Sequence, residues 1–396
     1  MDLTNSKLSS FDFEGKRVLL RVDFNIPIRD EEVLNDERMV RALPTIKHLL
    51  EKAKSLRIIT HRGRPKESGE VQPEFSIKPI AKRLSQLLDI PVPIADYLDD
   101  LEQDKKIIML ENIRFFQGEK ENSTNLSKTL GNYGDVYIMD AFGTAHRKQA
   151  STFGVIDSVA EAGVGFLVED ELEALKKILV NPKKPLIGII GGSKISTKIN
   201  VIDSLTSYVD KLIIGGALAN TCYMAMGKNI GKSLFEEDYI DVAEKLVGNE
   251  KIVLPENVVV LDTSNDSVFE KHIDDIASHE AICDVGKKSL KYFQKHINSA
   301  KTVFWNGPLG KFEDPRFSEG TSEVAKIMSE SKAYSIIGGG ETITSFANIN
   351  LMDSVDYAST AGGAFLEYIE NNSLPCIDKI ITVSYTHLTL PTITGV

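Results

Sequence analysis

A glycine pair followed by two lysines is the stretch of this sequence whose residue types suggest chemistry most directly. The run IIGGSKISTKI covers residues 189–199 and places Lys194 and Lys198 after Gly191 and Gly192. Adjacent glycines let backbone N–H groups approach an anion, and the N-terminus of a following helix adds positive potential. The spacing matches neither G-x-x-x-x-G-K-[ST] nor G-x-G-x-x-G. The stretch therefore predicts an anion site, with an ordinary strand-to-helix turn as the alternative.

Arginine is distributed very unevenly between the two halves of the chain. Eleven arginines precede position 150 and only Arg316 follows it, whereas lysines occur throughout. The planar guanidinium suits bidentate capture of phosphate or carboxylate, and lysine acts as a movable point charge. The halves are therefore predicted to bind anions differently. Four arginines lie in no recognisable loop motif and are attributed to composition alone: Arg17, Arg29, Arg57 and Arg83.

Bulk properties limit the classes of protein that this chain can represent. Its 396 residues exceed the roughly 250–300 that one hydrophobic core supports, so two domains are expected. The net charge of −11 argues against nucleic-acid or anionic-membrane partners. Three widely spaced cysteines, no apolar signal core and no run of about 18 apolar residues favour a soluble, cytoplasmic protein.

Short apolar runs alternate with longer amphipathic ones, which is typical of strand–helix units around a parallel sheet. Eight apolar runs pass directly into polar, charged or glycine residues, as in RVLLRVDFN, LRIITHRGRP, PLIGIIGGSK and YSIIGGGET. In open α/β sheets that carboxyl edge is where ligands bind, so these junctions are the candidate site loops. Residues 164–185 predict a connecting helix, and residues 119–127 predict a surface loop without chemistry.

These junctions together resemble the phosphoglycerate kinase family. The matching pieces appear in the family's order: RVDFNIP, HRGRP, LENIRF, DAFGTAHR, GGSKISTKI, WNGPLGKFE and GGGET. The resemblance implies an α/β fold of two Rossmann-like domains with parallel sheets joined by a hinge helix. It implies a phosphoglycerate domain over 1–165, the hinge helix over 166–185, a nucleotide domain over 186–368 and a return segment over 369–396.

By the same resemblance the N-terminal domain holds the phosphoglycerate site. Arginines there would hold phosphate and carboxylate bidentately, while shorter polar side chains orient the substrate. Arg38 is the implied catalytic arginine, and His146 is expected only to position Arg147. The implied substrate-binding residues are Asp23, Asn25, Arg38, His61, Arg64, Arg114 and Arg147. For an isolated residue the alternatives are a turn former, a surface charge or a helix cap.

The C-terminal domain is the implied nucleotide site. Lys198 matches the family's nucleotide-phosphate ligand, and Lys194 matches the catalytic lysine that meets the transferring phosphoryl group. The strand-end loop near the ribose matches at Asn306 and Glu313. The loop beside the phosphates and magnesium matches at Gly339, Gly340, Glu341 and Thr342, with Glu341 as the metal-proximal carboxylate.

The resemblance implies reversible phosphoryl transfer between 1,3-bisphosphoglycerate and ADP, giving 3-phosphoglycerate and ATP, with Mg²⁺ bound to the nucleotide. Catalysis would consist of in-line positioning and neutralisation of charge, and the phosphoglycerate carboxylate is itself the nucleophile in the reverse direction. Arg38 and Lys194 stand on different domains, so the hinge is expected to close. The family's usual form is a monomer.

Three positions in the nucleotide half depart from the family pattern. Glu341 stands where the family usually has aspartate, Ala361 where it has the first glycine of a phosphate-facing triplet, and Ile282 where a glycine approaches the base. These departures motivate a second hypothesis, a ligand-binding homologue with an impaired nucleotide site and little turnover. A dinucleotide dehydrogenase is a third, disfavoured by the absence of G-x-G-x-x-G.

The C-terminal residues break the family pattern completely. From about Val383 the sequence VSYTHLTLPTITGV resembles a translated sequencing adapter, so we predict a non-native tail that contributes few packed contacts. An edge strand of β-branched residues is the alternative.

Overall fold

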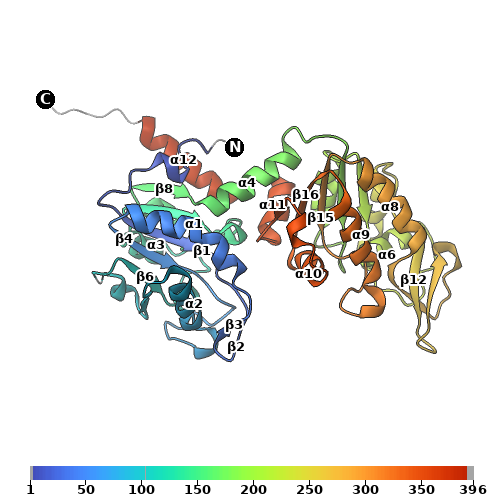
Figure 1. Cartoon of the computed structure of the whole chain (residues 1–396), viewed down its shortest axis with the longest axis horizontal. Helices are drawn as coiled ribbons and strands as arrows, with labels where there is room; N and C mark the ends of the chain where they lie inside the picture. The colour runs from blue at the N-terminus through green and yellow to red at the C-terminus, as the bar shows by residue number, and fades with distance from the viewer. Residues whose placement is uncertain (1–2, 103, 390–396) are drawn as a thin grey trace. The chain divides into compact units, whose positions relative to one another are not determined.

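The computed structural model describes residues 3–102 and 104–389. The chain divides into two compact units (Figure 1). The first runs to Glu173 and resumes at Ser373, and the second is the continuous segment Ala174–Asn372. Both units are α/β and each contains a six-stranded parallel sheet, so the predicted fold class is confirmed.

The sheet of the first unit has the strand order β5-β6-β4-β1-β7-β8. Strands β4, β6 and β5 lie on one side of β1, and the later strands β7 and β8 lie on the other. The strand order therefore reverses between β1 and β7. The strands are β1 Arg17–Val22, β4 Ser55–Ile59, β5 Ile94–Ala95, β6 Ile107–Leu110, β7 Val136–Asp140 and β8 Glu161–Val164. The helices are α1 Glu37–Lys52, α2 Lys78–Leu88, α3 Thr124–Gly131, α4 Phe166–Leu179 and α12 Pro375–Thr389, and β2 Ile28–Arg29 pairs with β3 Glu32–Val33 in a separate hairpin.

Successive residues of β1 face opposite sides of the sheet, and this alternation decides what each residue packs against. Val18, Leu20 and Val22 belong to the apolar core that also contains Met39 and Ile46 of α1. The residues between them, Leu19 and Arg21, point to the other face, and both are completely buried. A buried arginine in a central strand needs polar partners on that face.

The second unit repeats this architecture. Its parallel sheet has the order β11-β10-β9-β15-β16-β17, which is the 3-2-1-4-5-6 order of dinucleotide-binding folds. The strands are β9 Leu186–Ile190, β10 Lys211–Ile214, β11 Ile252–Val253, β15 Thr302–Asn306, β16 Tyr334–Gly338 and β17 Tyr357–Ala358. The helices are α5 Ile199–Thr206, α6 Ala217–Ala225, α7 Ile240–Val247, α8 Lys287–Ser299, α9 Glu319–Glu330, α10 Gly340–Asn348 and α11 Gly363–Asn371.

Helices cover both faces of this second sheet. Trp305 of β15 packs edge-on against Phe346 of α10, and its neighbour Phe304 stacks on Phe365 of α11 from the opposite face. The indole N–H of Trp305 donates to the Gly307 carbonyl at 2.7 Å, and the side chain is completely buried. A feature that the sequence did not predict is a second, antiparallel sheet of β12 Asn257–Asp262, β13 Val268–His272 and β14 Glu280–Val285.

The segment predicted as a hinge, residues 166–185, contains α4 and then a non-helical stretch that leads into β9. The division between the two units falls inside α4, between Glu173 and Ala174. No helix among the described residues is long and apolar enough to cross a membrane.

The return segment forms α12, which lies beside β8 in the first unit (Figure 1). The Cys376 amide donates to the Ala145 carbonyl at 3.1 Å, and Ile377 and Ile380 are completely buried. Residues 383–389 continue this helix, so the alternative of an edge strand is wrong for them, and Ser384 donates to the Ala162 carbonyl at 3.0 Å. Residues 390–396 of the predicted tail lie outside the described residues.

Candidate active site

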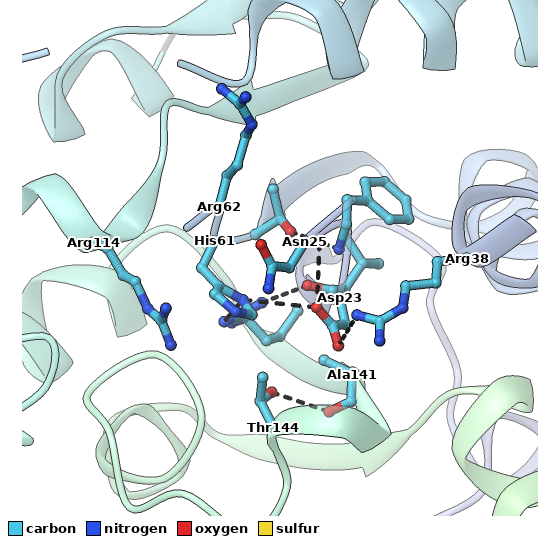
Figure 2. A network of polar contacts seen from close by, with 12 residues as sticks. Asp23, Asn25, Arg38, His61, Arg62, Arg114, Ala141 and Thr144 are labelled. Atoms are coloured by element: carbon cyan, nitrogen blue, oxygen red, sulfur yellow. Dashed lines mark hydrogen bonds and ion pairs between the residues drawn. The ribbon is translucent and has the colours of Figure 1, made fainter. Parts of the chain in front are cut away.

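Polar side chains of the first unit gather where β1, β4 and β7 end. Asp23 directly follows β1, beside which the strand order reverses, and His61 follows β4, the neighbour of β1 on its other side. Arg38 Nη1 donates to Asp23 Oδ2 at 2.8 Å, and His61 Nδ1 lies 3.8 Å from Asp23 Oδ1 (Figure 2). Burial alone would raise the pKa of Asp23, but the charges of Arg38 and Arg21 and the hydrogen bond from the Asn25 backbone amide help to lower it. Asp23 is therefore an ionised carboxylate that orients Arg38.

Asn25 connects this carboxylate to the loop after β4. Its side-chain Oδ1 accepts from the Gly63 backbone amide at 3.0 Å, and its backbone amide donates to Asp23 Oδ1 at 3.3 Å. Gly63 has a φ of +61°, and a Cβ there would lie 2.5 Å from the Phe75 ring, so only glycine fits this turn. The fixed turn places the residues on either side of Gly63.

Two further arginines carry positive charge into the same cluster. Arg114 is almost completely buried, and burial, together with the charges of Arg147 and Arg21, lowers its pKa to about 10. Its Nη1 donates to the Gly63 carbonyl and its Nε has no partner, although it is buried. Arg147 donates from Nε to His146 Nε2 at 3.1 Å.

The remaining residues of the HRGRP loop are placed differently. Arg62 donates to the carbonyls of Glu74 and Ser76 at 2.7 and 3.1 Å, and Figure 2 shows its side chain pointing away from Asp23. Arg64 is exposed on the loop. The structure thus brings six of the seven expected residues together: Asp23, Asn25, Arg38, His61, Arg114 and Arg147. Several guanidiniums around an oriented carboxylate can bind an anion that also offers hydroxyl groups.

The lysine loop of the second unit occupies the corresponding position, where β9 and β15 end. Lys198 precedes α5 directly and donates from Nζ to the Gly191 carbonyl at 2.6 Å and to Asn306 Oδ1 at 2.7 Å. Burial lowers its pKa to about 8, against the opposing effect of the Glu341 charge. Lys194 is exposed in the turn before the helix, and the Glu236 carboxylate holds this turn by accepting from the Ser196 amide and hydroxyl.

Neighbouring loops fix the lysine in place. Asn306 Nδ2 donates to the Gly338 carbonyl at 2.8 Å, and the Gly307 amide donates to the Thr342 hydroxyl at 2.7 Å. Gly339 has a φ of +93° and precedes α10, whose first turn carries Glu341. The expected Asn306 and Gly339–Thr342 loops therefore lie beside Lys198.

A largely apolar cavity of about 410 Å³ opens beside these loops. Its walls include Gly192, Gly216, Tyr223 and Leu309. The carboxylate residues Glu313 and Glu341 also line it. An apolar cavity of this size with a few charged groups suits a small molecule whose apolar part fills the cavity and whose polar part meets the loops at its edge.

The carboxylates of this region fit a metal only in part. The described residues contain no group of three His, Cys, Asp or Glu side chains that could hold a metal ion. Glu341 is exposed and stands at a helix N-terminus within electrostatic range of Lys198. Magnesium commonly uses one or two carboxylates plus substrate phosphates. Glu341 therefore fits a magnesium ion that arrives with a nucleotide, and it does not form a resident metal site.

Comparison with known proteins identifies the family. The family model "Phosphoglycerate kinase" matches residues 8–372. The phosphoglycerate kinase of Coxiella burnetii (strain RSA 493 / Nine Mile phase I) is 44% identical over 384 residues, covering 95% of this chain and 98% of that protein. That of Francisella tularensis subsp. novicida (strain U112) is 42% identical over 380 residues, covering 94% and 97%. The chain belongs to the phosphoglycerate kinase family.

Solved structures of the family agree with this assignment. The structure of phosphoglycerate kinase from Coxiella burnetii matches with a TM-score of 0.87 and 42% identity, covering 96% of this chain and 99% of that one. The structure from Pyrococcus horikoshii OT3 matches with a TM-score of 0.82 and 29% identity, covering 96% and 99%. Membership in the phosphoglycerate kinase family makes this chain a phosphotransferase.

Two of the three departures from the phosphoglycerate kinase pattern, Ile282 and Ala361, donate backbone hydrogen bonds to nearby serine hydroxyls. Ile282 lines the cavity, and its amide donates to the Ser233 hydroxyl at 2.8 Å. Ala361 is buried, and its amide donates to the Ser359 hydroxyl at 3.2 Å. Ile282 is thus part of the cavity wall, whereas Ala361 is not among the residues that line the cavity.

Sequence reasoning missed part of the phosphoglycerate kinase site. Residues 119–127 were expected to form a surface loop without chemistry, and the structure agrees only in part: residues 120–125 are exposed or half-buried, but Glu119 is completely buried and accepts from the Ser151 amide and hydroxyl at 2.9 and 2.6 Å. Thr124 and the residues after it begin α3. Arg21 is the partner that makes this burial possible, and its position in the apolar run RVLLRV was the only signal.

Proposed function

We propose that the end of β1 and β4 in the first unit binds phosphoglycerate. The observation that carries this proposal is the ion pair of Asp23 with Arg38, surrounded by His61 and the buried Arg114, on the family's own motifs. Guanidiniums bind phosphate and carboxylate bidentately, and Asp23 and Asn25 accept hydrogen bonds from a substrate hydroxyl. Arg147 and the exposed Arg64 supply further charge for the phosphate.

The nucleotide is assigned to the second unit. The apolar cavity suits the purine, Asn306 and Glu313 suit the ribose side, and Lys198 with the Gly339–Thr342 loop suits the phosphates. Mg²⁺ bound to ATP or ADP neutralises phosphate charge, and Glu341 is the carboxylate that would hold it.

The reaction of the family is the reversible transfer of a phosphoryl group between 1,3-bisphosphoglycerate and ADP, giving 3-phosphoglycerate and ATP, a step of glycolysis. Such a transfer depends on positioning and charge neutralisation more than on covalent chemistry by the protein. Arg38 and Lys194 are the proposed catalytic residues, which stabilise charge on the transferring group from the two units. Their cooperation requires a bending of the hinge around α4.

We base the oligomeric state, the cellular location and the metal requirement proposed for this chain on its family. We propose a monomer in the cytoplasm that requires Mg²⁺ with its nucleotide. The proposed substrates are 3-phosphoglycerate, 1,3-bisphosphoglycerate, ATP and ADP.

A coupled assay of ATP-dependent 1,3-bisphosphoglycerate formation tests the proposed function. Turnover that requires both 3-phosphoglycerate and Mg-ATP supports it. Saturable binding of both ligands without turnover would instead establish the ligand-binding homologue.

A further inference from the structure

The most unusual side chain of the first unit is Arg21, an arginine in a central strand with no exposed surface. Its Nη2 lies 3.2 Å from His61 Nδ1, its Nε donates to the Ser151 hydroxyl at 3.0 Å, and its Nη1 donates to the Val22 carbonyl. Arg21 therefore contacts His61, a proposed substrate-binding residue, from the buried side.

A chain of hydrogen bonds fixes Arg21 in this position. The Ser151 hydroxyl accepts from Arg21 Nε and donates to Glu119 Oε1 at 2.6 Å. Tyr137 donates to the Ser151 carbonyl at 2.9 Å. Burial raises the pKa of Glu119, while the charge of Arg21 and the hydrogen bonds from Ser151 oppose that rise. The guanidinium thus has a buried counter-charge of its own.

The contact with Arg21 determines which nitrogen of His61 carries the proton. A guanidinium has N–H donors only and does not deprotonate, so Nδ1 must be the acceptor. Asp23 Oδ1 is the competing partner of Nδ1, but at 3.8 Å it is beyond hydrogen-bond distance. Burial and the charges of Arg21, Arg114 and Arg147 lower the pKa of His61 well below its usual value, although Asp23 opposes them. The neutral ring must then carry its proton on Nε2.

We propose that Arg21 is a positioning residue that fixes the Nε2–H tautomer of His61, so that the ring offers one N–H donor to an anionic oxygen of the substrate. The opposite tautomer would direct a lone pair at that oxygen. The inference deepens the proposed function and rests on phosphoglycerate binding at this cluster.

His146 provides a contrast within the same cluster. Its Nε2 accepts from Arg147 Nε, and its Nδ1 is buried without a partner. By the same reasoning His146 carries its proton on Nδ1. Two neighbouring histidines are therefore held in opposite tautomers, each by one arginine.

Long-range ¹H–¹⁵N NMR of the ligand-free protein tests the tautomer directly. With seven histidines in the chain, the signals of His61 and His146 are assigned by their loss in the variants His61→Asn and His146→Asn. We expect Nε2–H for His61 and Nδ1–H for His146. An Nδ1–H or cationic His61 would overturn the proposal, whichever substrate the protein uses.

Substitution of the ring itself tests the donor role. Glutamine places its amide nitrogen near the position of Nε2, whereas asparagine places it near Nδ1. We expect His61→Gln to keep the KM for 3-phosphoglycerate within about threefold of the parent, and His61→Asn to raise it about tenfold or more. The KM for ATP should not change in either variant. Equal losses in both variants would contradict donation through Nε2.

The role of Arg21 is tested by the double variant Arg21→Met with Glu119→Gln, which removes both buried charges together. We expect a mixture of His61 tautomers and a KM for 3-phosphoglycerate raised about tenfold.

Arg57→Met is the matched control, because Arg57 is also a buried arginine but donates to the Leu101 and Lys105 carbonyls. An unchanged tautomer and KM in a folded double variant would overturn the positioning role. An unchanged KM for 3-phosphoglycerate despite a changed His61 tautomer would contradict the proposal that the substrate binds at His61.

Discussion

The two units bind anions with different groups at equivalent places in similar sheets. In the first unit side chains supply the site, because the carboxylate of Asp23 follows β1 and is oriented by Arg38 of α1, and Arg114 from the segment after β6 adds a second guanidinium. In the second unit backbone and glycine loops form much of the site, with Lys198 held by the Gly191 carbonyl and Asn306. The topology sets the place, at the point where the strand order reverses. The loop residues set the chemistry.

This difference has a consequence for how each site tolerates change. A site made of long side chains depends on their charges, so it is sensitive to substitution of the charged residue itself. A site made of closely packed backbone depends on the absence of side chains, so it is sensitive to any added Cβ. The following predictions test the two kinds of dependence.

The largest effect is expected from loss of one catalytic charge in either unit. Arg38→Ala and Lys194→Ala should each lower kcat about 10²–10³-fold, because each removes one preorganised electrostatic group. Steady-state kinetics in both reaction directions measures this effect, and substrate binding should change less.

The matched controls lie at the opposite ends of the strands. Arg17 pairs with Asp135 at the start of β1, and Lys211 donates to the Glu250 carbonyl at the start of β10. Arg17→Ala and Lys211→Ala should keep kcat within about twofold. A parent-like kcat in Arg38→Ala or Lys194→Ala would remove that residue from the catalytic set.

The backbone site should respond to a single added methyl group. A Cβ at Gly307 would lie 2.5 Å from Lys198 Nζ and 2.3 Å from the Gly191 carbonyl oxygen, at a φ of +89°. Gly307→Ala should raise the KM for ATP about tenfold or more while leaving the KM for 3-phosphoglycerate unchanged. Gly227→Ala separates crowding from backbone strain, because Gly227 has a φ of +71° but open space around its Cβ position. If both variants had the same KM for ATP, close packing around Lys198 would not explain the nucleotide site.

The two units should also differ in their dependence on pH. Burial lowers the pKa of Lys198 to about 8, so the lysine is a cation below that pH and neutral above it. Because the free enzyme controls kcat/KM, the value for ATP should fall about tenfold between pH 7 and pH 9. The value for 3-phosphoglycerate at saturating ATP should lack this limb, since bound phosphates keep Lys198 charged. Lys198→Arg should abolish the limb, and its persistence would assign the titration to another group.

A smaller effect is expected at Glu341, which carries the only charge in the first turn of α10. Glu341→Asp should stay active with at most a modest change in metal requirement, because one negative charge remains near the phosphates. Glu341→Ala should raise the KM for Mg-ATP several-fold and the KM for 3-phosphoglycerate much less. The measurement is kcat and KM across a magnesium titration. The same magnesium dependence in Glu341→Ala and the parent would show that the carboxylate does not serve the metal.

Features that depend on residues close together in the sequence could be predicted from it, and features that depend on distant residues could not. The glycine loop at 191–192 and the strand-end motifs were predictable, because glycine and a polar residue after an apolar run act within a few positions. Arg21 and Glu119 were not, because their burial depends on Ser151, far along the chain from both. The antiparallel sheet of β12, β13 and β14 was also missed, since pairing of strands is a tertiary property.

The smallest effect is expected at the C-terminal end, where the first unit depends on a segment distant in sequence and the second unit does not. Truncation after Thr389 keeps all of α12, and by the expectation from the sequence for the tail it should leave the unfolding midpoint unchanged. Truncation after Thr382 also removes Ser384, which donates to the Ala162 carbonyl at 3.0 Å and accepts from the Ser6 hydroxyl at 3.1 Å. Loss of these hydrogen bonds should cost about 1 kcal/mol, equivalent to about 2–4 °C in the unfolding midpoint of a unit of this size. Thermal unfolding and kcat of both truncated chains measure the difference, and kcat should remain at the parent value in each. An identical midpoint for the two truncations would favour the expectation from the sequence, that residues from Val383 onward contribute few packed contacts.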